Sequence, residues 1–162
     1  SGGGKARITF GTSDCMATSQ KMNTTDTNVG GYSGCAFYGT LTNTIFGTLP
    51  AELRAVIKQV NKKTSAGNQS ATIVTTAEKL FLLSEVEVHG AISYAKSGEG
   101  TQYATFTSGG SKVKKIGAAV SHWWLRSPFA IYATHFCYVG SDGTAAGNAA
   151  SYAYGVAFGL CV

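Results

Sequence analysis

The sequence predicts a single α+β domain of short antiparallel strands, one or two helices and long loops. Three observations lead to this class: short alternating or β-branched stretches, one clear amphipathic helical pattern, and many glycine-rich turns. The chain has 162 residues, of which 44% are hydrophobic, with 21 Gly and 2 Pro. This length suits one domain with its own core. We expect that domain over 5–162, after a Ser-Gly-Gly-Gly stretch at 1–4 typical of a linker or cloning scar.

The N-terminal third combines a strand, a loop and a helix. Residues 5–10 alternate polar and apolar side chains, which predicts a strand, and the polar, glycine-rich 11–34 predicts a long loop. The clearest helical pattern covers 49–60, where Thr48 is placed to cap the helix and Pro50 suits its first turn. Its apolar face consists of Leu53, Val56, Ile57 and Val60.

The middle of the chain is less regular. The β-branched segment 71–75 predicts a strand. The apolar run 79–83 is typical of a buried strand, with Ser84 capping a short helix after it; a helix across 77–88 is the competing interpretation. Glycines interrupt 93–121, which is therefore expected to be irregular.

The tail from 122 onward has an unusual composition. After Arg126 it contains no Lys, Arg, Glu, Gln, Met or Trp, and its only charged residue is Asp142. Strands are expected at 122–126, 132–139 and 155–162, with a hairpin turn at 141–143.

The first residues of this tail, Trp123 to Arg126, are interpreted as structural residues and not as ligand contacts. Trp123 and Trp124 are adjacent, so on a strand they face opposite sides, one of them anchoring the core. Arg126 among apolar neighbours is expected to pair with a carboxylate or with carbonyls. Glutamates upstream are interpreted as helix or surface residues: Glu52, Glu78, Glu85, Glu87 and Glu99. Two groups of lysines are interpreted as solvated surface: Lys58, Lys62 and Lys63, and Lys112, Lys114 and Lys115.

Composition and motifs argue against several classes of function. The net charge is +5, but every basic residue lies at or before Arg126, away from the aromatic tail, so we expect no nucleic-acid partner. No apolar run reaches the length of a membrane span. The sequence contains no phosphate loop, dinucleotide fingerprint or nucleophile elbow, and its three histidines have no triad or metal spacing. No catalytic residue, metal or cofactor is therefore predicted.

Four cysteines, at 15, 35, 137 and 161, lack zinc-ligand spacing. We favour buried free thiols, which behave as small hydrophobic groups. An even number also permits two bridges, and Cys137–Cys161 is the first to check because both residues fall in expected strands.

The segments 129–135 and 145–154 consist largely of small, aromatic and hydroxyl residues, among them Tyr, Ser, Gly and Asn. Antibody-like loops use these residue types, because Tyr gives a large contact area at low entropic cost and small residues adapt. An ordinary Gly/Ala/Tyr-rich β region accounts for much of the same composition. The four tyrosines of this tail nevertheless favour a binding surface.

Several blocks carry a resemblance to a known family. They are Trp-Trp-Leu-Arg-Ser-Pro at 123–128, Phe-Cys-Tyr-Val-Gly-Ser-Asp-Gly at 136–143, Gly-Val-Ala-Phe-Gly-Leu-Cys-Val at 155–162, and upstream Thr-Asn-Val-Gly-Gly-Tyr at 27–32, Leu-Pro at 49–50 and Lys-Leu-Phe-Leu-Leu-Ser at 79–84. Together, over most of the chain, they resemble phage and microbial variable proteins that diversity-generating retroelements diversify. The resemblance implies a C-type-lectin fold of the formylglycine-generating-enzyme type, used as a scaffold for variable ligand binding.

This resemblance also implies which residues vary. Retroelement mutagenesis replaces adenines, chiefly in Asn codons, and cannot then produce Lys, Glu, Gln, Met or Trp, which are all absent after Arg126. The implied ligand-binding positions are Phe129, Ala130, Ile131, Tyr132, Ala133, Thr134, His135, Tyr138, Ala145, Ala146, Gly147, Ser151, Tyr152, Ala153 and Tyr154. Residues free to vary cannot hold a core, so we expect one exposed, mostly contiguous face.

The family implies recognition of a protein or surface ligand of a host or target cell, from a virion tail or a cell surface. Two departures are visible. The sequence has Ser-Gly-Cys-Ala-Phe-Tyr at 33–38 where relatives often carry Ser-x-Met-Arg, and no counterpart of the formylglycine-generating cysteine site is identifiable. Two alternatives remain. One is an enzyme related to the formylglycine-generating group, and the other is a structural phage or surface domain without a variable site.

Overall fold

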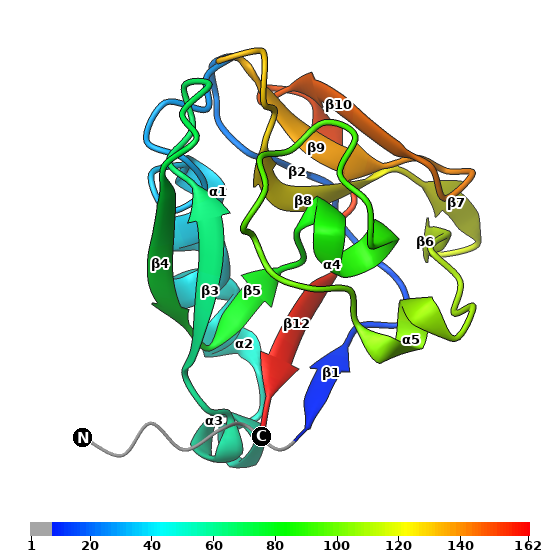
Figure 1. The fold of residues 1–162 in the computed structure, drawn as a ribbon. Coiled ribbons are helices and arrows are strands. Elements are labelled where there is room, and N and C mark those ends of the chain that lie inside the picture. Colours follow the sequence, from blue (N-terminus) through cyan, green and yellow to red (C-terminus); the bar gives the residue numbers. More distant parts are fainter. Residues whose placement is uncertain (1–7) are drawn as a thin grey trace.

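A computed structural model describes residues 8–162 of the chain. The fold is mostly β, with 32% strand and 18% helix, and its strands are divided among several small antiparallel sheets (Figure 1). The expectation of an α+β, C-type-lectin-like fold is therefore wrong, since no C-type-lectin fold is identified in this arrangement. The physical reason is that the helical segments are short, and pairing between distant segments determines the architecture.

Two three-stranded sheets dominate the structure. The first has the order β1-β12-β5 and the second the order β10-β9-β8. β1 pairs with β12, so the strand expected at 5–10 does lie against the C-terminal segment; residues 5–7 are outside the described residues. The bounds are β1 Thr9–Gly11, β5 Leu80–Leu82, β8 Trp123–Pro128, β9 His135–Val139, β10 Ala145–Ala149 and β12 Phe158–Cys161.

Three two-stranded pairs complete the β structure. β3 and β4 form a long hairpin, β6 and β7 a short one, and β11 returns to pair with β2 in the long N-terminal loop. The bounds are β2 Gln20–Lys21, β3 Val60–Ser65, β4 Ile73–Glu78, β6 Lys114–Ile116, β7 Ala119–Ser121 and β11 Ala153–Tyr154. β10, β11 and the β6–β7 hairpin lie in segments where no strand is expected from the sequence.

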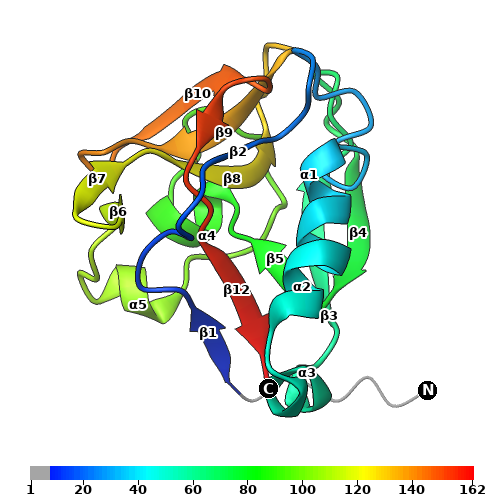
Figure 2. The same cartoon turned by 180° about the vertical axis from the view of Figure 1, so that it is seen from behind.

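One continuous helical stretch, seen well in Figure 2, runs beside the β3–β4 hairpin. It consists of α1 (Ala36–Gly39), a π-helical segment η1 (Thr40–Ile45) and α2 (Phe46–Thr48). Phe37, Leu41 and Ile45 are buried on one face because they are spaced four residues apart. No helix is predicted over 36–48 from the sequence, although apolar side chains spaced four residues apart are typical of a helix.

The helix expected at 49–60 is much shorter. α3 covers only Ala51–Val56, and Pro50, not Thr48, precedes it without a side-chain cap. Ile57 turns into extended backbone and is buried, and the Lys58 amide then donates to the Cys161 carbonyl at 2.8 Å. Pairing with the C-terminal strand thus ends the helix, although the apolar periodicity continues.

The short helix α4 (Glu85–His89) follows β5, as the favoured interpretation predicted, and the competing helix over 77–88 is wrong. The Ser84 side chain accepts from the Glu87 amide while the Glu87 side chain accepts from the Ser84 amide, a capping box. Gly90 ends the helix in the left-handed conformation, at φ +73°. One more turn, α5 (Ala104–Thr107), interrupts the segment expected to be irregular.

β8 separates two hydrophobic cores. Trp124 packs in the first core with Tyr32, Leu41 and other residues of the helical side. Trp123 and Leu125 pack in the second core, toward α4 and α5. The two tryptophans face opposite sides, as predicted for adjacent strand residues, and both are fully buried.

All four cysteines are free thiols, so the proposed Cys137–Cys161 bridge does not form. Cys35, Cys137 and Cys161 are buried and Cys15 is half-buried. The preference for buried free thiols is confirmed for these three.

No helix within 8–162 combines the length and the apolar character needed to cross a bilayer.

We predict that Trp123→Ala and Trp124→Ala each lower the free energy of unfolding by about 3–5 kcal/mol, since each removes a large side chain from a separate close-packed core. Chemical denaturation measures this. Val120→Ala, at an exposed position on β7, is the control and should change stability little. Unchanged stability in both tryptophan variants would contradict the assignment of β8 as scaffold.

Candidate functional site

The loop 129–134 between β8 and β9 is fastened by the buried side chain of Asn28. The Asn28 amide Nδ2 donates to the Tyr132 carbonyl at 2.8 Å and to the His135 carbonyl at 2.7 Å. Its Oδ1 accepts from the Asn68 amide, and its own backbone amide donates to the Ala133 carbonyl at 2.6 Å. Every Asn28 contact to the loop is made to main-chain atoms, and none of them depends on a loop side chain.

Three further main-chain hydrogen bonds fix the same loop. The Ala130 amide donates to the Tyr94 carbonyl at 2.7 Å, and the Phe129 amide donates to the His135 carbonyl at 3.0 Å. The Thr134 carbonyl accepts from the Ala150 amide, which joins the loop to the turn before β11. The loops 129–134 and 150–152 therefore lie side by side, at the end of the molecule opposite α3 (Figure 1).

Rings from this loop, from the segment after α4 and from the start of β9 form what we call the Phe129 cluster: Tyr94, Phe129, Tyr132 and His135. The Phe129 ring is stacked between Tyr94 and Tyr132, with centroid distances of 5.2 and 5.4 Å. Tyr132 is 52% exposed, and Ile131 beside it in sequence is 63% exposed. Tyr94 lies outside the predicted tail; no sequence signal assigned it to the site.

A second group of rings, the Tyr154 cluster, contains His122, Trp124, Tyr138, Tyr152 and Tyr154. The Tyr154 ring centroid is 4.8 Å from Tyr138, 4.7 Å from Trp124 and 5.1 Å from His122. The Tyr154 hydroxyl accepts from the Asn148 amide at 2.6 Å, and Tyr152, 54% exposed, lies at the edge of the cluster.

These two clusters lie on opposite faces of β9. His135 contacts Phe129, whereas Tyr138 contacts Tyr154, and residues three apart on a strand point to opposite sides. The expectation of a single face is corrected accordingly: the rings form two clusters on either side of the sheet, and the adjacent loops carry exposed residues of both.

Most of the predicted positions reach solvent. Phe129 is the exception, because it is 7% exposed and belongs to the second core. The exposed positions are Ile131, Tyr132, Thr134, Tyr152 and Ala153; the half-buried ones are Ala130, Ala133, His135, Tyr138, Ala145, Ala146, Gly147, Ser151 and Tyr154.

Gly147 on β10 lies directly against the Phe129 ring. A Cβ placed at this glycine would be 2.0 Å from Phe129 Cδ2, far inside contact distance. A full ring at position 129 therefore requires glycine at 147, unless the ring moves. The two positions are sterically coupled, although both are predicted to vary.

We expect Gly147→Ala to lower the free energy of unfolding by about 1–3 kcal/mol through overpacking against the ring. In a Phe129→Ala background the same change should cost little, so a double-mutant cycle by chemical denaturation should give a coupling of about 1–2 kcal/mol. Gly11→Ala, where a Cβ meets nothing within 4 Å, is the matched control. Additive effects in the cycle would disprove the coupling.

Below the Phe129 cluster lies a buried ionic network centred on Arg126, which is fully buried. Its Nη1 donates to Glu87 Oε2 at 2.5 Å and to the Leu82 carbonyl at 2.8 Å. The other guanidinium nitrogens donate to Thr64 Oγ1 and to the Lys63 and Glu99 carbonyls. The prediction that Arg126 pairs with a carboxylate or with carbonyls is confirmed, since it does both.

Glu87 is shared by two buried cations. Its Oε1 accepts from Lys62 Nζ at 2.5 Å. Burial raises the pKa of this carboxyl, but Arg126 and Lys62 together outweigh burial and hold it below its usual value. Glu85 and Glu87 do lie in a helix, as expected, although both are buried. Glu78 and Glu99 are buried outside the helices, so their interpretation as helix or surface residues is wrong. Lys62 and Lys114 are buried too, so their interpretation as solvated surface is also wrong. Isolated sequence positions could not reveal that these charges meet.

Two other buried carboxylates hold loops. Glu85 accepts from the amides of Ser93, Tyr94 and Ala95, at 2.6 to 3.2 Å, and so positions the loop that carries Tyr94. Glu99 accepts from the Ser65 amide and from the Ser127 hydroxyl. Glu85 therefore positions the loop that carries Tyr94, while Glu99 joins its own loop to β3 and β8.

Glu78 differs from the other buried glutamates because one of its carboxylate oxygens has no hydrogen-bond partner within residues 8–162. Its Oε1 accepts from the Thr76 hydroxyl at 2.5 Å, while its Oε2 is buried without any partner in the described part of the chain. Burial raises the pKa of Glu78 to about 7, despite Thr76 and the charges of Arg126 and Lys62, which lower it.

Because the pKa of Glu78 is higher in the folded protein than in the unfolded chain, Glu78 is protonated in the folded protein but ionised in the unfolded chain between about pH 4.5 and pH 7. Stability should therefore fall as pH rises through this window. We predict that Glu78→Gln, which imitates the neutral carboxyl, leaves stability near pH 4.5 almost unchanged and raises it by up to about 3 kcal/mol at pH 7.5. Denaturation curves across pH test this, with exposed Glu52→Gln as control. Parallel pH profiles for wild type and Glu78→Gln would refute it.

The chemistry available at the two clusters is stacking and hydrogen bonding. Within residues 8–162, no three His, Cys, Asp or Glu side chains converge in a group that could hold a metal ion. Burial raises the pKa of the Cys15 and Cys35 thiols to about 11 each, and that of Cys137 well above its ordinary value. These three thiols are therefore protonated near neutral pH and are poor nucleophiles.

Comparison with known proteins gives one match. No curated protein and no solved structure matches the chain. One family model, described as "Domain of unknown function (DUF6273)", matches residues 9–162 and so includes both aromatic clusters and the buried network. Because this match covers nearly the whole sequence, the chain belongs to the DUF6273 family.

Proposed function

We propose that this protein binds a ligand through its C-terminal loops and that a retroelement diversifies these loops. The observation that carries the proposal is the main-chain fastening of 129–135. Asn28 holds the loop through the Tyr132, Ala133 and His135 backbones, so exposed side chains can change without loss of these hydrogen bonds. A loop that keeps its shape while its chemistry changes is what a variable binding site requires.

Exposed aromatic and aliphatic side chains support binding rather than a purely structural role. Ile131, Tyr132 and Tyr152 are each more than half exposed on neighbouring loops. Clustered exposed apolar side chains mark interaction sites, and Tyr is favoured in contact surfaces because its rigid ring has one polar end.

The ligand is proposed to be a protein or surface ligand of a host or target cell. Arg126 is fully buried, and Asp142 is the only charged residue after it, so contacts would be stacking and neutral hydrogen bonds more than ion pairs. On this proposal the protein acts on a virion tail or a cell surface, where it meets such ligands.

The coupling of positions 129 and 147 limits which combinations a diversified population can contain. A ring at 129 requires glycine at 147, whereas a small residue at 129 leaves room for a side chain at 147. Diversification would therefore yield paired changes at these two positions.

Sequencing the encoding locus from many individuals of one population tests the proposal. We expect a near-copy of the 3′ end beside a reverse transcriptase gene, with differences only at adenines. Variation should concentrate in the codons for Ile131, Tyr132, Thr134 and Tyr152. Four equally exposed codons of the β3–β4 hairpin serve as matched controls and should stay constant: Asn61, Lys63, Thr75 and Ala77.

Equal variation in the two sets of codons would indicate neutral drift at the surface and would overturn diversification. Purified variants that differ only in the loops should also bind different targets from a displayed panel of cell-surface proteins. Identical binding by variants with different loops would overturn the binding role of this site.

A further inference from the structure

β1 is an edge strand whose outer side has no partner among the described residues. Its inner side pairs with β12, through the Thr12 amide to the Phe158 carbonyl and the Val162 amide to the Ile8 carbonyl. Because inward and outward residues alternate in an antiparallel pair, Phe10 also points its backbone groups inward. The amides and carbonyls of Thr9 and Gly11 therefore point outward, and all three residues of β1 are exposed.

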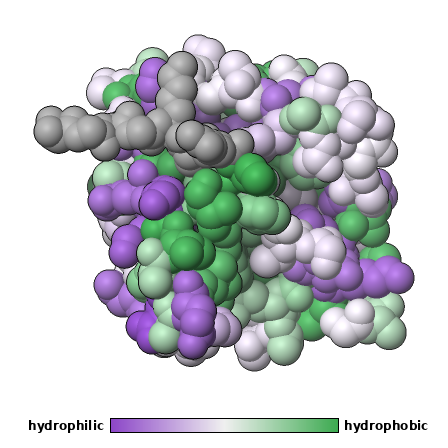
Figure 3. Space-filling view, turned by 90° about the horizontal axis from the view of Figure 1, so that it is seen from below, coloured by the Kyte–Doolittle hydropathy of each residue, from purple (hydrophilic) through white to green (hydrophobic). Residues whose placement is uncertain are grey.

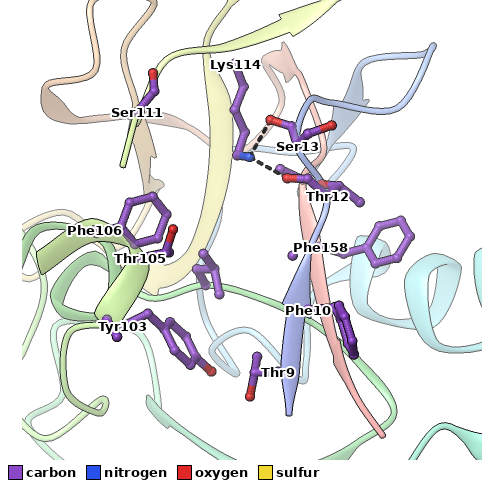
Figure 4. A pocket seen from close by; sticks show the side chains of 14 residues that line it. Thr9, Phe10, Thr12, Ser13, Tyr103, Thr105, Phe106, Ser111, Lys114 and Phe158 are labelled. Atoms are coloured by element: carbon purple, nitrogen blue, oxygen red, sulfur yellow. Dashed lines mark hydrogen bonds between the residues drawn. The ribbon is translucent and has the colours of Figure 1, made fainter. Parts of the chain in front are cut away.

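A cavity of about 540 Å³ lies along this outward edge, between β1 and α5. Figure 4 shows the Tyr103, Thr105 and Phe106 side chains on one side of it and β1 on the other. Leu83 and Ala157, which belong to or adjoin the second core, contribute apolar walls. At this end of the molecule apolar side chains also gather on the surface (Figure 3), where Ile8, Phe10 and Val56 are exposed.

Lys114 closes one end of the open edge. Its buried ammonium group donates to the Thr12 carbonyl at 2.5 Å and to the Ser13 carbonyl at 2.9 Å. These acceptors are consequently occupied, and the open edge ends at Gly11. Its two donors and two acceptors, from Thr9 and Gly11, have no partner within residues 8–162. Thr12 Oγ1 beside them is buried without a partner in the described chain.

Gly11 has no structural requirement for being glycine. It is absent from the residues with positive φ, and a Cβ built on it meets nothing within 4 Å. Glycine inside a strand weakens it and often marks a place where another backbone or a ligand approaches closely. Here the space that a side chain would occupy opens on the cavity.

We propose that this edge of β1 is a docking site for an extended peptide segment of a partner protein, which adds to the sheet as a fourth strand. The segment would exchange hydrogen bonds with the Thr9 and Gly11 backbones. The Thr9 side chain lies 3.2 Å from Cys161 Sγ, on the side of the second core. Residues opposite Thr9 and Gly11 point to that same side, so the segment needs apolar side chains at positions i and i+2 to face Leu83 and Phe106.

This docking site is independent of the proposed ligand-binding loops. The loops 129–134 and 150–152 lie at the other end of the molecule, beyond both hydrophobic cores (Figure 1). A partner held at β1 would leave the loops free, so one surface can attach the protein while the other recognises a ligand.

The matched variants Gly11→Pro and Gly11→Ala test the site. Proline removes the outward amide without touching the inward bonds to β12, and edge strands tolerate it. Alanine retains the amide and has room. The probe is a phage-displayed library of random hexapeptides, selected on wild-type protein. We expect enriched peptides with apolar i and i+2 residues, bound normally by Gly11→Ala and about tenfold more weakly by Gly11→Pro.

Amide hydrogen exchange gives a second readout on the wild type. The Thr9 and Gly11 amides should exchange fast in the free protein and become protected by the selected peptide, whereas the Thr12 amide is protected throughout. Thr105→Trp, which fills the cavity from α5, should also abolish peptide binding and replaces Gly11→Pro if that variant does not fold.

Three results would overturn the proposal: no peptide enriched, peptides bound equally by Gly11→Pro and Thr105→Trp, or protected Thr9 and Gly11 amides in the free protein. A dimer in sedimentation that Gly11→Pro dissociates would instead show that a second copy pairs at this edge, and would also overturn it. None of these results depends on whether the loops bind a ligand or vary.

Discussion

The fold depends on one constraint: every nitrogen of the buried Arg126 guanidinium must have a hydrogen-bond acceptor. Arg126 donates to acceptors from β3, β5, α4 and the loop at 99, and each of its three nitrogens has a partner. Burying a charge is costly unless it is paired and hydrogen-bonded. These four segments must therefore converge on β8 in this one arrangement, or the cation remains unpaired in a dry interior.

The contacts of Arg126 also position residues of the candidate site. Glu87 neutralises Arg126 and Lys62 and also caps α4, so the charge network and the helix start share one side chain. Glu85 on that helix then binds the amides of 93–95 and places Tyr94 against Phe129. A network of buried charges thus determines where an aromatic surface forms, without any of those charges reaching the surface.

Side-chain identity and backbone position are decoupled at the loops and coupled beneath them. Asn28 holds the loop through the Tyr132, Ala133 and His135 carbonyls, so these hydrogen bonds do not depend on the side chains of Ile131 and Tyr132. Phe129 and Gly147 lie deeper. A Cβ on Gly147 would be only 2.0 Å from the Phe129 ring, so the two residues limit each other's size. Steric constraint on side-chain size therefore increases with depth, and burial indicates it better than position in the sequence.

Local signals determined several elements by themselves. The Ser84 cap and its helix, the buried strand before it, the turn at 141–143 and the opposed tryptophans follow from short-range chemistry: capping, apolar runs, turn residues and alternation. The composition of the tail likewise pointed to positions that, apart from Phe129, reach solvent. These features need only neighbours a few residues apart, so the sequence contains enough to predict them.

Only the tertiary structure decided which distant segments meet. The helix expected over 49–60 ends early because the Lys58 amide donates to the Cys161 carbonyl. Asn28 binds a loop more than a hundred residues away in the sequence. Four glutamates expected in helices or on the surface are buried. The division of the sheet into small units and of the rings into two clusters also depends on pairing register. The physical reason is that long-range pairing and the burial of charge are decided by the sum of many contacts, whereas periodicity and composition describe one segment at a time.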